Sequence, residues 1–309
     1  MTIQYLDFER PVGALEKSAE KLRREGQDAQ AQALSERAER QLRDIYGRLS
    51  PWQRTQVARH PGRPRFHRLA AGLFTDMVAI AGDRCFGEDR AIWAGFARLS
   101  GRPVALIGHV KGEDTETRLA HNFGMARPEG YRKAVRLLEM ADSCGLPVIS
   151  LVDTAGAFPG IDAEERGQAE AIAAATEASL GIGVPFVAAI VGEGGSGGAV
   201  AVAAANRVLM LENAIYSVIS PEGCASILWR SGDAGPKAAD AMKLTAGDLL
   251  RLNVIDRIVY EPLGGAHREP ETAIARLRAA LVEELGLLDG RDASALRADR
   301  RERYLRMAV

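Results

Sequence analysis

The sequence has little of what marks several common classes of protein. Only three of its 309 residues are cysteines, Cys85, Cys144 and Cys224; they are far apart, and none has a histidine at metal-ligand spacing. This pattern argues against a disulfide framework and a zinc site, and it favours a reducing compartment. Forty lysines and arginines balance 41 aspartates and glutamates. Without surplus positive charge, no overall field favours nucleic acid or an anionic membrane.

Long hydrophobic runs are also absent. No stretch reaches the roughly 18 consecutive apolar residues that a membrane-spanning helix requires. The first residues do not form a basic segment followed by an apolar one, and they soon include Asp7 and Glu9, so a secretory signal is not expected. We therefore expect a soluble, cytoplasmic protein.

Short β-like runs alternate with helical segments through the middle of the chain. Residues 128–143 have apolar side chains at helical spacing before Gly145, and Ser220 followed by Pro221 predicts another helix start. The runs expected to form strands are 92–99, 104–107, 148–152, 186–191, 208–211, 215–219 and 254–259. This alternation predicts an α/β fold in which helices cover a largely buried sheet.

The two ends of the chain differ from this body. Residues 14–49 have the pattern of an amphipathic helix with one break. Residues 291–306 have the pattern of an arginine-rich helix whose charges we expect to be solvated. We divide the chain into a helical arm at 1–60, expected to contact another subunit, a main domain at 61–290 and a basic tail at 291–309.

Two glycine-rich loops follow two of the predicted strands. The strand at 186–191 leads into Gly-Glu-Gly-Gly-Ser-Gly-Gly-Ala at 192–199. The strand at 148–152 leads into Asp-Thr-Ala-Gly-Ala-Phe-Pro-Gly at 153–160, and a helix is expected at 163–180. Backbone N–H groups are the main polar groups of such loops, and at a helix start they bind an anion or a developing oxyanion. Two strand-loop-helix units in tandem predict one shared site.

The loop at 192–199 fits three interpretations. In the first, Gly192, Gly194 and Gly197 have the spacing of a dinucleotide-binding fingerprint. Glu212, twenty positions after the first glycine, would be its acidic residue. Against this interpretation, few residues are available for the helix that should follow the loop.

A second interpretation makes Ser196 the nucleophile of an acyl hydrolase, because Gly194-x-Ser196-x-Gly198 has the spacing of a nucleophile elbow. Of the five histidines only His267 follows this serine, and no local sequence links it to an acid. In a third interpretation, the glycines let a substrate oxygen approach backbone N–H groups that form an oxyanion hole. The structural alternative is a tight turn packed against a neighbouring element.

Longer motifs distinguish among these interpretations. They are the loop at 192–199, Asn-Phe-Gly-Met at 122–125, Pro-Glu-Gly-Tyr-Arg-Lys-Ala at 128–134, Glu-Glu-Arg-Gly-Gln at 164–168, Tyr-Ser-Val-Ile-Ser-Pro-Glu-Gly-Cys-Ala-Ser-Ile-Leu-Trp at 216–229 and Pro-Leu-Gly-Gly-Ala-His-Arg at 262–268. In this order they resemble the carboxyltransferase α subunit of bacterial-type acetyl-CoA carboxylase. The similarity runs nearly from end to end.

The resemblance implies a crotonase-like fold, a β-β-α superhelix whose oxyanion holes stabilise enolates of acyl-CoA thioesters. It implies transfer of a carboxyl group from carboxybiotin to acetyl-CoA, giving malonyl-CoA for fatty acid synthesis within an ATP-dependent complex. Related carboxyltransferases that act on propionyl-CoA share the fold and the glycine loops. The implied partners are a zinc-bearing β subunit in an α2β2 heterotetramer, a biotin carboxyl carrier protein and biotin carboxylase; no metal is implied in this chain.

The resemblance also implies roles for residues of both loops. Backbone N–H groups of Gly197 and Gly198 are expected to form an oxyanion hole that faces biotin. Gly194 and Gly195 are expected to shape the turn, and Ser196 to be small rather than nucleophilic. The residues expected to bind biotin or substrate are Gly194, Gly195, Ser196, Gly156, Ala157, Phe158 and Gly160.

The chain departs from the family pattern in two places. The family usually has proline at the position of Ala155 and tyrosine at that of Phe158, so a hydrogen bond from that hydroxyl is lost here. Residues 109–118 are more acidic than the family's lysine-rich version, which leaves Lys111 and Arg118 as local cations that we expect to be solvated. If this segment contacts CoA phosphates, the affinity is expected to be weaker.

Overall fold

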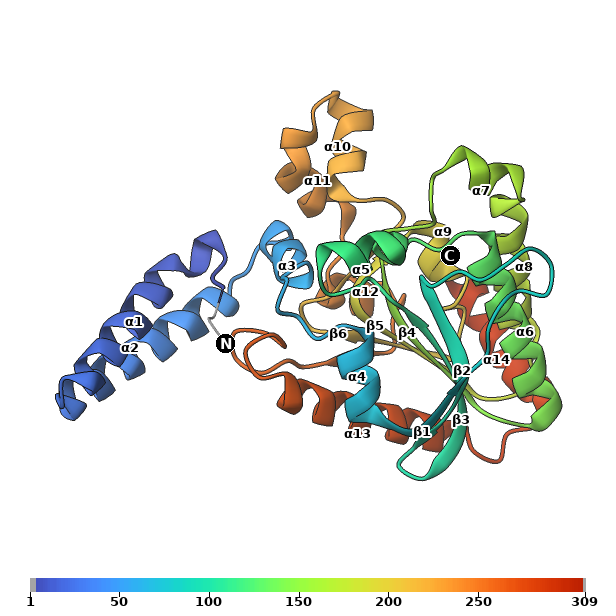
Figure 1. Ribbon diagram of the computed structural model, residues 1–309, viewed down its shortest axis with the longest axis horizontal. Helices are drawn as coiled ribbons and strands as arrows, with labels where there is room; N and C mark the ends of the chain where they lie inside the picture. Colours follow the sequence, from blue (N-terminus) through green and yellow to red (C-terminus); the bar gives the residue numbers. More distant parts are fainter. Residues whose placement is uncertain (1–3, 308–309) are drawn as a thin grey trace.

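A mixed sheet forms the centre of the computed structural model, which describes residues 4–307 (Figure 1). Its strands are β1 (Phe74–Ala79), β2 (Ile92–Leu99), β3 (Arg102–His109), β4 (Val148–Thr154), β5 (Phe186–Gly195), β6 (Arg207–Leu211), β7 (Ile215–Ser217) and β8 (Arg257–Val259). They lie in the order β1-β2-β3-β4-β5-β6-β8, and β7 pairs with the end of β5. The first three strands are antiparallel, whereas β3, β4, β5, β6 and β8 run parallel.

Helices cover the sheet and lie toward both ends of the described part of the chain. The α-helices are α1 (Arg10–Arg24), α2 (Asp28–Tyr46), α3 (Pro51–Ala58), α4 (Phe66–Leu73), α5 (Thr115–Ala120), α6 (Pro128–Cys144), α7 (Ile161–Glu165), α8 (Gln168–Gly181), α9 (Ser196–Val200), α10 (Pro221–Trp229), α11 (Gly235–Met242), α12 (Ala246–Arg251), α13 (Pro270–Leu288) and α14 (Ala293–Arg306). Short 3-10 helices lie at Asp7–Glu9, Asn122–Gly124 and Gly232–Ala234. Within residues 4–307, none of the helices combines the length and the apolar character needed to cross a membrane.

The central strands are covered on both faces. On one face, Phe66 of α4 packs directly on Gly108 of β3, and α13 lies beside α4 (Figure 1). On the other, α6 contacts β2 and β3, α8 lies against α6, and α14 against α8. Every residue of β4 and β5 is buried. This two-sided burial explains why both strands have nearly continuous apolar sequences rather than an alternating pattern.

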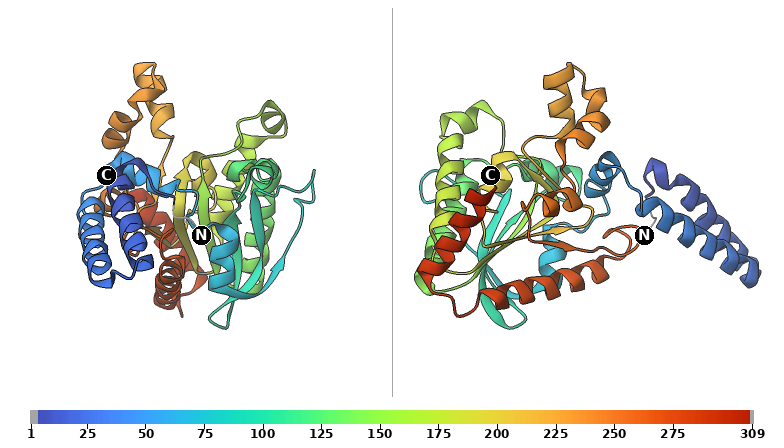
Figure 2. Two further views of the ribbon diagram at one scale, coloured as in Figure 1. Left: turned by 60° about the vertical axis from the view of Figure 1, so that its left-hand side comes forward. Right: turned by 180° about the vertical axis from the view of Figure 1, so that it is seen from behind.

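The N-terminal arm is a two-helix hairpin that projects from the sheet (Figures 1 and 2). α1 and α2 pack mainly on each other, and Val12, Ala38 and Leu42 form a small buried cluster between them. Arg268 ties the arm to the body by donating to Glu16 at 2.8 Å. Much of the arm's apolar stripe is thus covered within the hairpin, and its contact with another subunit stays a prediction.

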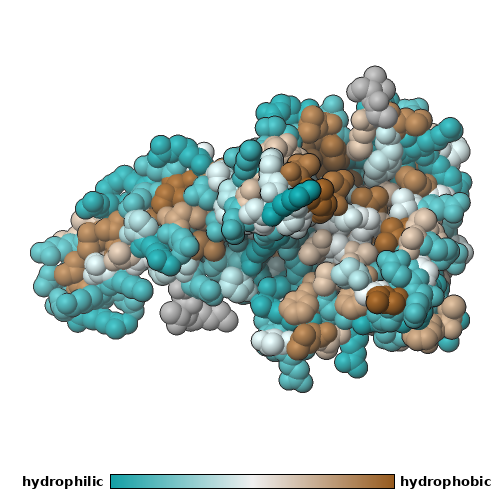
Figure 3. Space-filling view, turned by 90° about the horizontal axis from the view of Figure 1, so that it is seen from above, coloured by the Kyte–Doolittle hydropathy of each residue, from teal (hydrophilic) through white to brown (hydrophobic). Residues whose placement is uncertain are grey.

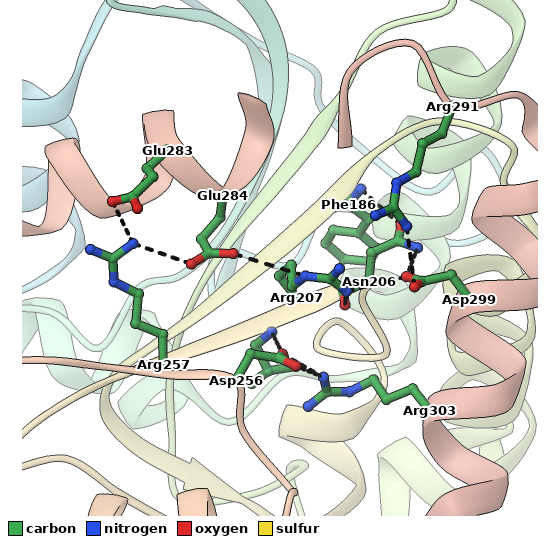
Figure 4. A network of polar contacts seen from close by, with 11 residues as sticks. Phe186, Asn206, Arg207, Asp256, Arg257, Glu283, Glu284, Arg291, Asp299 and Arg303 are labelled. Atoms are coloured by element: carbon green, nitrogen blue, oxygen red, sulfur yellow. Dashed lines mark hydrogen bonds and ion pairs between the residues drawn. The ribbon is translucent and has the colours of Figure 1, made fainter. Parts of the chain in front are cut away.

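The C-terminal helix is docked on the body through ion pairs. Figure 4 shows Asp299 and Arg303 of α14 in a network of polar contacts that reaches α13 and the strands. Arg303 pairs with Asp256, and Arg207 of β6 lies 3.3 Å from Asp299. Arg300 is fully buried. The expectation of a solvated face is therefore wrong for Arg300 and Arg303, because composition does not reveal which side of a helix will pack against the rest of the protein.

Most predicted elements are present, with shifted ends. The break in the first helix separates α1 from α2, and the strand at 92–99 is confirmed as β2. β5 continues through the glycines to Gly195, because its last three residues pair with β7. The helix predicted at 163–180 is split into α7 and α8, because Gly167 between them has a φ of 82°. The sequence analysis did not predict β1, an edge strand with mostly exposed side chains.

Candidate functional site

The two glycine loops lie side by side at one edge of the sheet. β4 and β5 are parallel neighbours, so both loops leave the sheet at the same end. A Cβ added to Gly198 would lie 2.6 Å from the carbonyl carbon of Gly156 and 2.7 Å from the nitrogen of Ala157. A Cβ added to Gly195 would overlap the carbonyl of Ala155. Backbone contact therefore requires glycine at both positions and joins the loops into one unit.

The turn between β5 and α9 is shorter than the glycine run. Gly194 and Gly195 are extended and pair with β7. They therefore belong to the strand, whereas the sequence analysis expected them to shape the turn. The chain turns at Ser196, which is exposed and has a φ of 55°. N–H groups in the first turn of a helix have no acceptor within that helix. The N–H groups of Gly197 and Gly198 are therefore available to an acceptor from outside α9.

An apolar cavity of about 500 Å³ opens beside this turn. Ser196 and Gly197 form part of its wall, and the other lining residues are Val200, Tyr216, Ser217, Val218, Met242, Leu249 and Val254. Burial raises the pKa of Tyr216, so its phenol is neutral at physiological pH. Among the described residues, neither a histidine nor a carboxylate lines this cavity. Its chemistry is therefore that of backbone donors beside an apolar wall.

Two buried polar side chains lie behind Gly198. The hydroxyl of Tyr131 would be 2.9 Å from a Cβ added to Gly198, so it fills the space on that side of the loop. His109 lies near the Gly198 backbone and is almost completely buried, and neither of its ring nitrogens has a hydrogen-bond partner among residues 4–307. Burial lowers the pKa of His109 to about 4, although the nearby Asp153 and the Gly198 backbone oppose this shift. The imidazole is therefore neutral at pH 7 and adds no charge behind the loop.

Gln168 of α8 holds the first loop in place. Its amide donates to the carbonyl groups of Ala126 and Phe158, both at 2.9 Å. The N–H of Phe158 donates to Ala126 as well. The Phe158 ring lies under the guanidinium of Arg127, 4.2 Å from its centroid, and it leaves no room for a side chain at Gly160. Cation–π packing thus orients this ring without the hydroxyl that the family's tyrosine would supply.

A second, charged cavity of about 190 Å³ borders the first loop at Ala155. The ammonium of Lys111 lies 2.7 Å from Asp153 and 2.8 Å from Glu193, and Glu193 also accepts from Arg59 at 2.7 Å. Burial disfavours the charge of Glu193, but Lys111 and Arg59 outweigh that effect and lower its pKa to about 2. These charges link the ends of β3, β4 and β5 to α3.

The geometry disfavours two of the three interpretations of the loop at 192–199. A dinucleotide site needs a helix that follows the loop, but α9 has only five residues and Gly194 packs against Tyr216. Ser196 has the backbone twist of an elbow, but none of the described residues that line its cavity is a base. The only later histidine, His267, is stacked on His60, with ring centroids 3.8 Å apart. Backbone donors need no such partner.

The sequence analysis did not identify His109, Tyr131 or Gln168 as parts of the site. Tyr131 and Gln168 occur within its longer motifs, so the motifs were the available signal. Their positions depend on how α6 and α8 pack on the sheet. The expectation that Lys111 is solvated is wrong, because only 11% of its side chain is exposed. No local pattern revealed that Asp153 and Glu193 would meet it.

Comparison with known proteins identifies relatives over almost the whole chain. Residues 5–308 match the profile of the family described as acetyl co-enzyme A carboxylase carboxyltransferase-like. The chain is 60% identical over 309 residues to the acetyl-coenzyme A carboxylase carboxyl transferase subunit alpha of Rhizorhabdus wittichii, covering 98% of this chain and 99% of that protein. It is 58% identical over 308 residues to the subunit alpha of Zymomonas mobilis, covering 98% of each.

Solved structures of lower identity share the fold. Transcarboxylase 12S, crystallised as a hexamer with methylmalonyl-coenzyme A and methylmalonic acid, matches with a TM-score of 0.60 and 18% identity. That match covers 76% of this chain and 44% of the other. A Pseudomonas malonate decarboxylase hetero-tetramer in complex with coenzyme A matches with a TM-score of 0.58 and 20% identity, covering 72% and 90%. The predicted crotonase-like fold is confirmed.

Proposed function

Since this chain belongs to the acetyl-CoA carboxylase carboxyltransferase family as an α subunit, we propose that its two glycine loops form the half of the active site that binds biotin. The reaction is carboxyl transfer to acetyl-CoA, which gives malonyl-CoA. One observation carries the assignment of the site: Gly198 contacts Gly156 and Ala157 backbone to backbone. This contact supports a rigid pair of donors, at Gly197 and Gly198, beside an open apolar cavity.

The residues of that cavity fit a biotin group attached to a carrier protein. Biotin supplies the carboxyl group that is transferred, and its compact bicycle joins a polar ureido ring to an apolar thioether ring. Val200, Leu249 and Val254 offer an apolar surface to such a ring. Gly197 has no side chain, so the backbone can be approached closely. A cavity of about 500 Å³ is within the range of small-molecule sites.

The chain acts on the reaction mainly through fixed dipoles. In this proposal the N–H groups of Gly197 and Gly198 donate to an oxygen that gains negative charge in the transition state. Donors that are already oriented stabilise this charge without reorganisation, and removing one costs about 10²- to 10³-fold in rate. Neutral His109 and Tyr131 behind the loop add no charge of their own. No protein base is required by this arrangement.

A carboxyltransferase α subunit has a β subunit as its partner. We assign most of the acetyl-CoA site to that subunit, bearing zinc, in an α2β2 assembly in the cytoplasm, with biotin carboxyl carrier protein and biotin carboxylase supplying the carboxyl group. Exposed apolar side chains near α10 support docking of a partner: Val218 is 82% exposed, Ile227 71% and Leu228 62%. Apolar side chains gather on the face seen from above, where α10 stands (Figure 3).

Reconstitution with the partner tests this proposal. The chain is co-purified with a zinc-bearing β subunit, and malonyl-CoA formation is measured with carboxylated carrier protein and acetyl-CoA. The complex is expected to be active and the isolated chain inactive, because each subunit supplies half of the site. Full turnover by the isolated chain would contradict the shared site. A parallel assay with propionyl-CoA tests the acceptor, and a preference for it would replace acetyl-CoA in the proposal.

A further inference from the structure

Two arginines in the charged cavity are not neutralised by its internal ion pairs. Arg59, Arg63 and Lys111 line this cavity, but each is paired with a carboxylate. Arg65 and Arg118 line it as well, and neither forms an ion pair with any residue in 4–307. The Nε atom of Arg118 is buried and has no hydrogen-bond acceptor within that part of the chain. The cavity therefore contains unused donors and unbalanced positive charge.

The two arginines are close enough to influence each other. Burial lowers the pKa of Arg65, and the charge of Arg118 adds to this shift, whereas Asp153, Glu113 and Glu193 oppose it. Two like charges in a partly buried cavity repel each other, and an anion between them relieves this repulsion. A guanidinium presents a planar fork of N–H donors that matches the oxygens of phosphate. The pair is therefore suited to a doubly charged oxyanion.

An exposed aromatic ring stands at the same cavity. Phe123 lines it, and this residue is 46% exposed. Asn122, Phe123 and Gly124 have successive φ values of 46°, 56° and 79°. Asparagine and glycine adopt such a conformation readily, but it is unfavourable for phenylalanine and persists there only when the surroundings impose it. The face of an exposed ring can stack on a planar group such as a nucleotide base.

We propose that Arg65, Arg118 and Phe123 bind a phosphorylated nucleotide, with a phosphate monoester between the arginines and the base against the ring of Phe123. A cavity of about 190 Å³ admits a phosphate but not a whole nucleotide, so the base lies outside it. Coenzyme A carries this group as a 3′-phosphorylated adenosine, and for that source the inference rests on the proposed function. A free nucleotide carries the same chemistry.

Calorimetric titration of the full-length chain with adenosine 3′,5′-bisphosphate tests the arginines. Arg65→Gln and Arg118→Gln are each expected to weaken binding by at least about tenfold, since each removes charge-assisted hydrogen bonds to the phosphate. Arg68→Gln is the matched control, because Arg68 is a nearby surface arginine that pairs with exposed Glu271 at 3.2 Å. Circular dichroism confirms that each variant is folded. Undiminished binding in folded Arg65 and Arg118 variants, or equal loss in the Arg68 variant, would overturn the site.

Titration with inorganic phosphate separates the contribution of the ring. Phe123→Leu is expected to weaken binding of the bisphosphate by at least about fivefold through lost stacking while leaving phosphate binding unchanged. An unchanged affinity for the bisphosphate would overturn the role of Phe123. Tighter binding of coenzyme A than of 3′-dephospho-coenzyme A would identify coenzyme A as the source, whereas equal binding of adenosine 5′-monophosphate would identify a free nucleotide.

The reconstituted complex distinguishes failure of this site from failure of the proposed function. If coenzyme A is the source, Arg65→Gln is expected to raise KM for acetyl-CoA and to leave kcat nearly unchanged. If the variants lose nucleotide binding, the site is upheld. If the wild-type complex shows no carboxyl transfer, the proposed function is refuted, and these two results can occur together. Active complexes whose KM and nucleotide affinity are unchanged by the substitutions would refute the site alone.

Discussion

The two cavities at the ends of β4 and β5 differ in the chemical groups that line them. The larger one, beside Ser196, combines backbone N–H groups with an apolar wall. The smaller one is lined by charged side chains, among them Lys111, Asp153 and Glu193. Fixed dipoles without net charge suit a negative charge that exists only during the reaction, whereas standing charges suit a permanent ion. According to the proposal, the two cavities therefore differ in when charge is present, and the following predictions test this difference.

Removing the central cation of the charged cavity is expected to have the largest effect. Lys111→Met leaves Asp153 and Glu193 facing each other, largely buried and without their shared partner. The free energy of unfolding is expected to fall by about 3–5 kcal/mol, the usual cost of an uncompensated buried charge. Glu193→Gln is the control and is expected to lower the free energy of unfolding by less. In this variant Lys111 is still paired with Asp153, and Arg59 is still paired with Glu222. Equal, small losses in urea denaturation would show that the charges are not coupled.

In the glycine loop at 192–199, the decisive substitution is Gly198→Ala. The added methyl group would collide with the backbone of Gly156 and Ala157, so the donors are expected to move and carboxyl transfer to fall by at least about 10²-fold, or about 2.7 kcal/mol. In Gly197→Ala the methyl group would meet only the side chain of Ile172, at 3.2 Å, and a much smaller loss is expected. Both variants are assayed with bound β subunit. Equal losses would contradict the proposed contact.

His109, which lies behind the loop at 192–199, is also expected to be uncharged. The dependence of the free energy of unfolding on pH tests this. The pKa of His109 falls from 6.5 to about 4 on folding, so between these values the unfolded chain binds a proton that the folded protein does not. The resulting stability is complete above pH 6.5 and is lost as the pH falls toward 4. Between pH 6.5 and 5 this group is expected to account for about 2 kcal/mol. His109→Gln is expected to give a flatter profile, and parallel profiles would mean that His109 is not buried neutral.

The smallest effect is expected at the serine of the turn. Ser196→Ala keeps the backbone donors, so activity is expected to fall by no more than about threefold, whereas loss of a nucleophile costs on the order of 10⁴-fold or more. A fluorophosphonate probe gives an independent measurement. Stoichiometric labelling of Ser196 would make this cavity the site of a covalent reaction and would remove the contrast with the charged cavity.

Local signals were sufficient for most elements of the fold. Ser220 caps α10 through its side chain, and Gly145 ends α6 in the left-handed conformation, as their positions in the sequence predict. The glycine run was harder to interpret, because the same residues can extend a strand or form a turn. Pairing with β7 decided in favour of the strand as far as Gly195. Local propensity is a weak guide where a neighbouring strand supplies the hydrogen bonds.

The sequence by itself determined the α/β class, the two glycine loops and, through long motifs, the family. These features depend on local periodicity and on residues that are near one another in the chain. Only the tertiary structure decided that Lys111 is buried between Asp153 and Glu193 and that Arg300, within the C-terminal helix, is buried against the body. Parallel strands bring the ends of distant segments together. The energy of a charged group depends on those neighbours and on its distance from water, and neither is encoded locally.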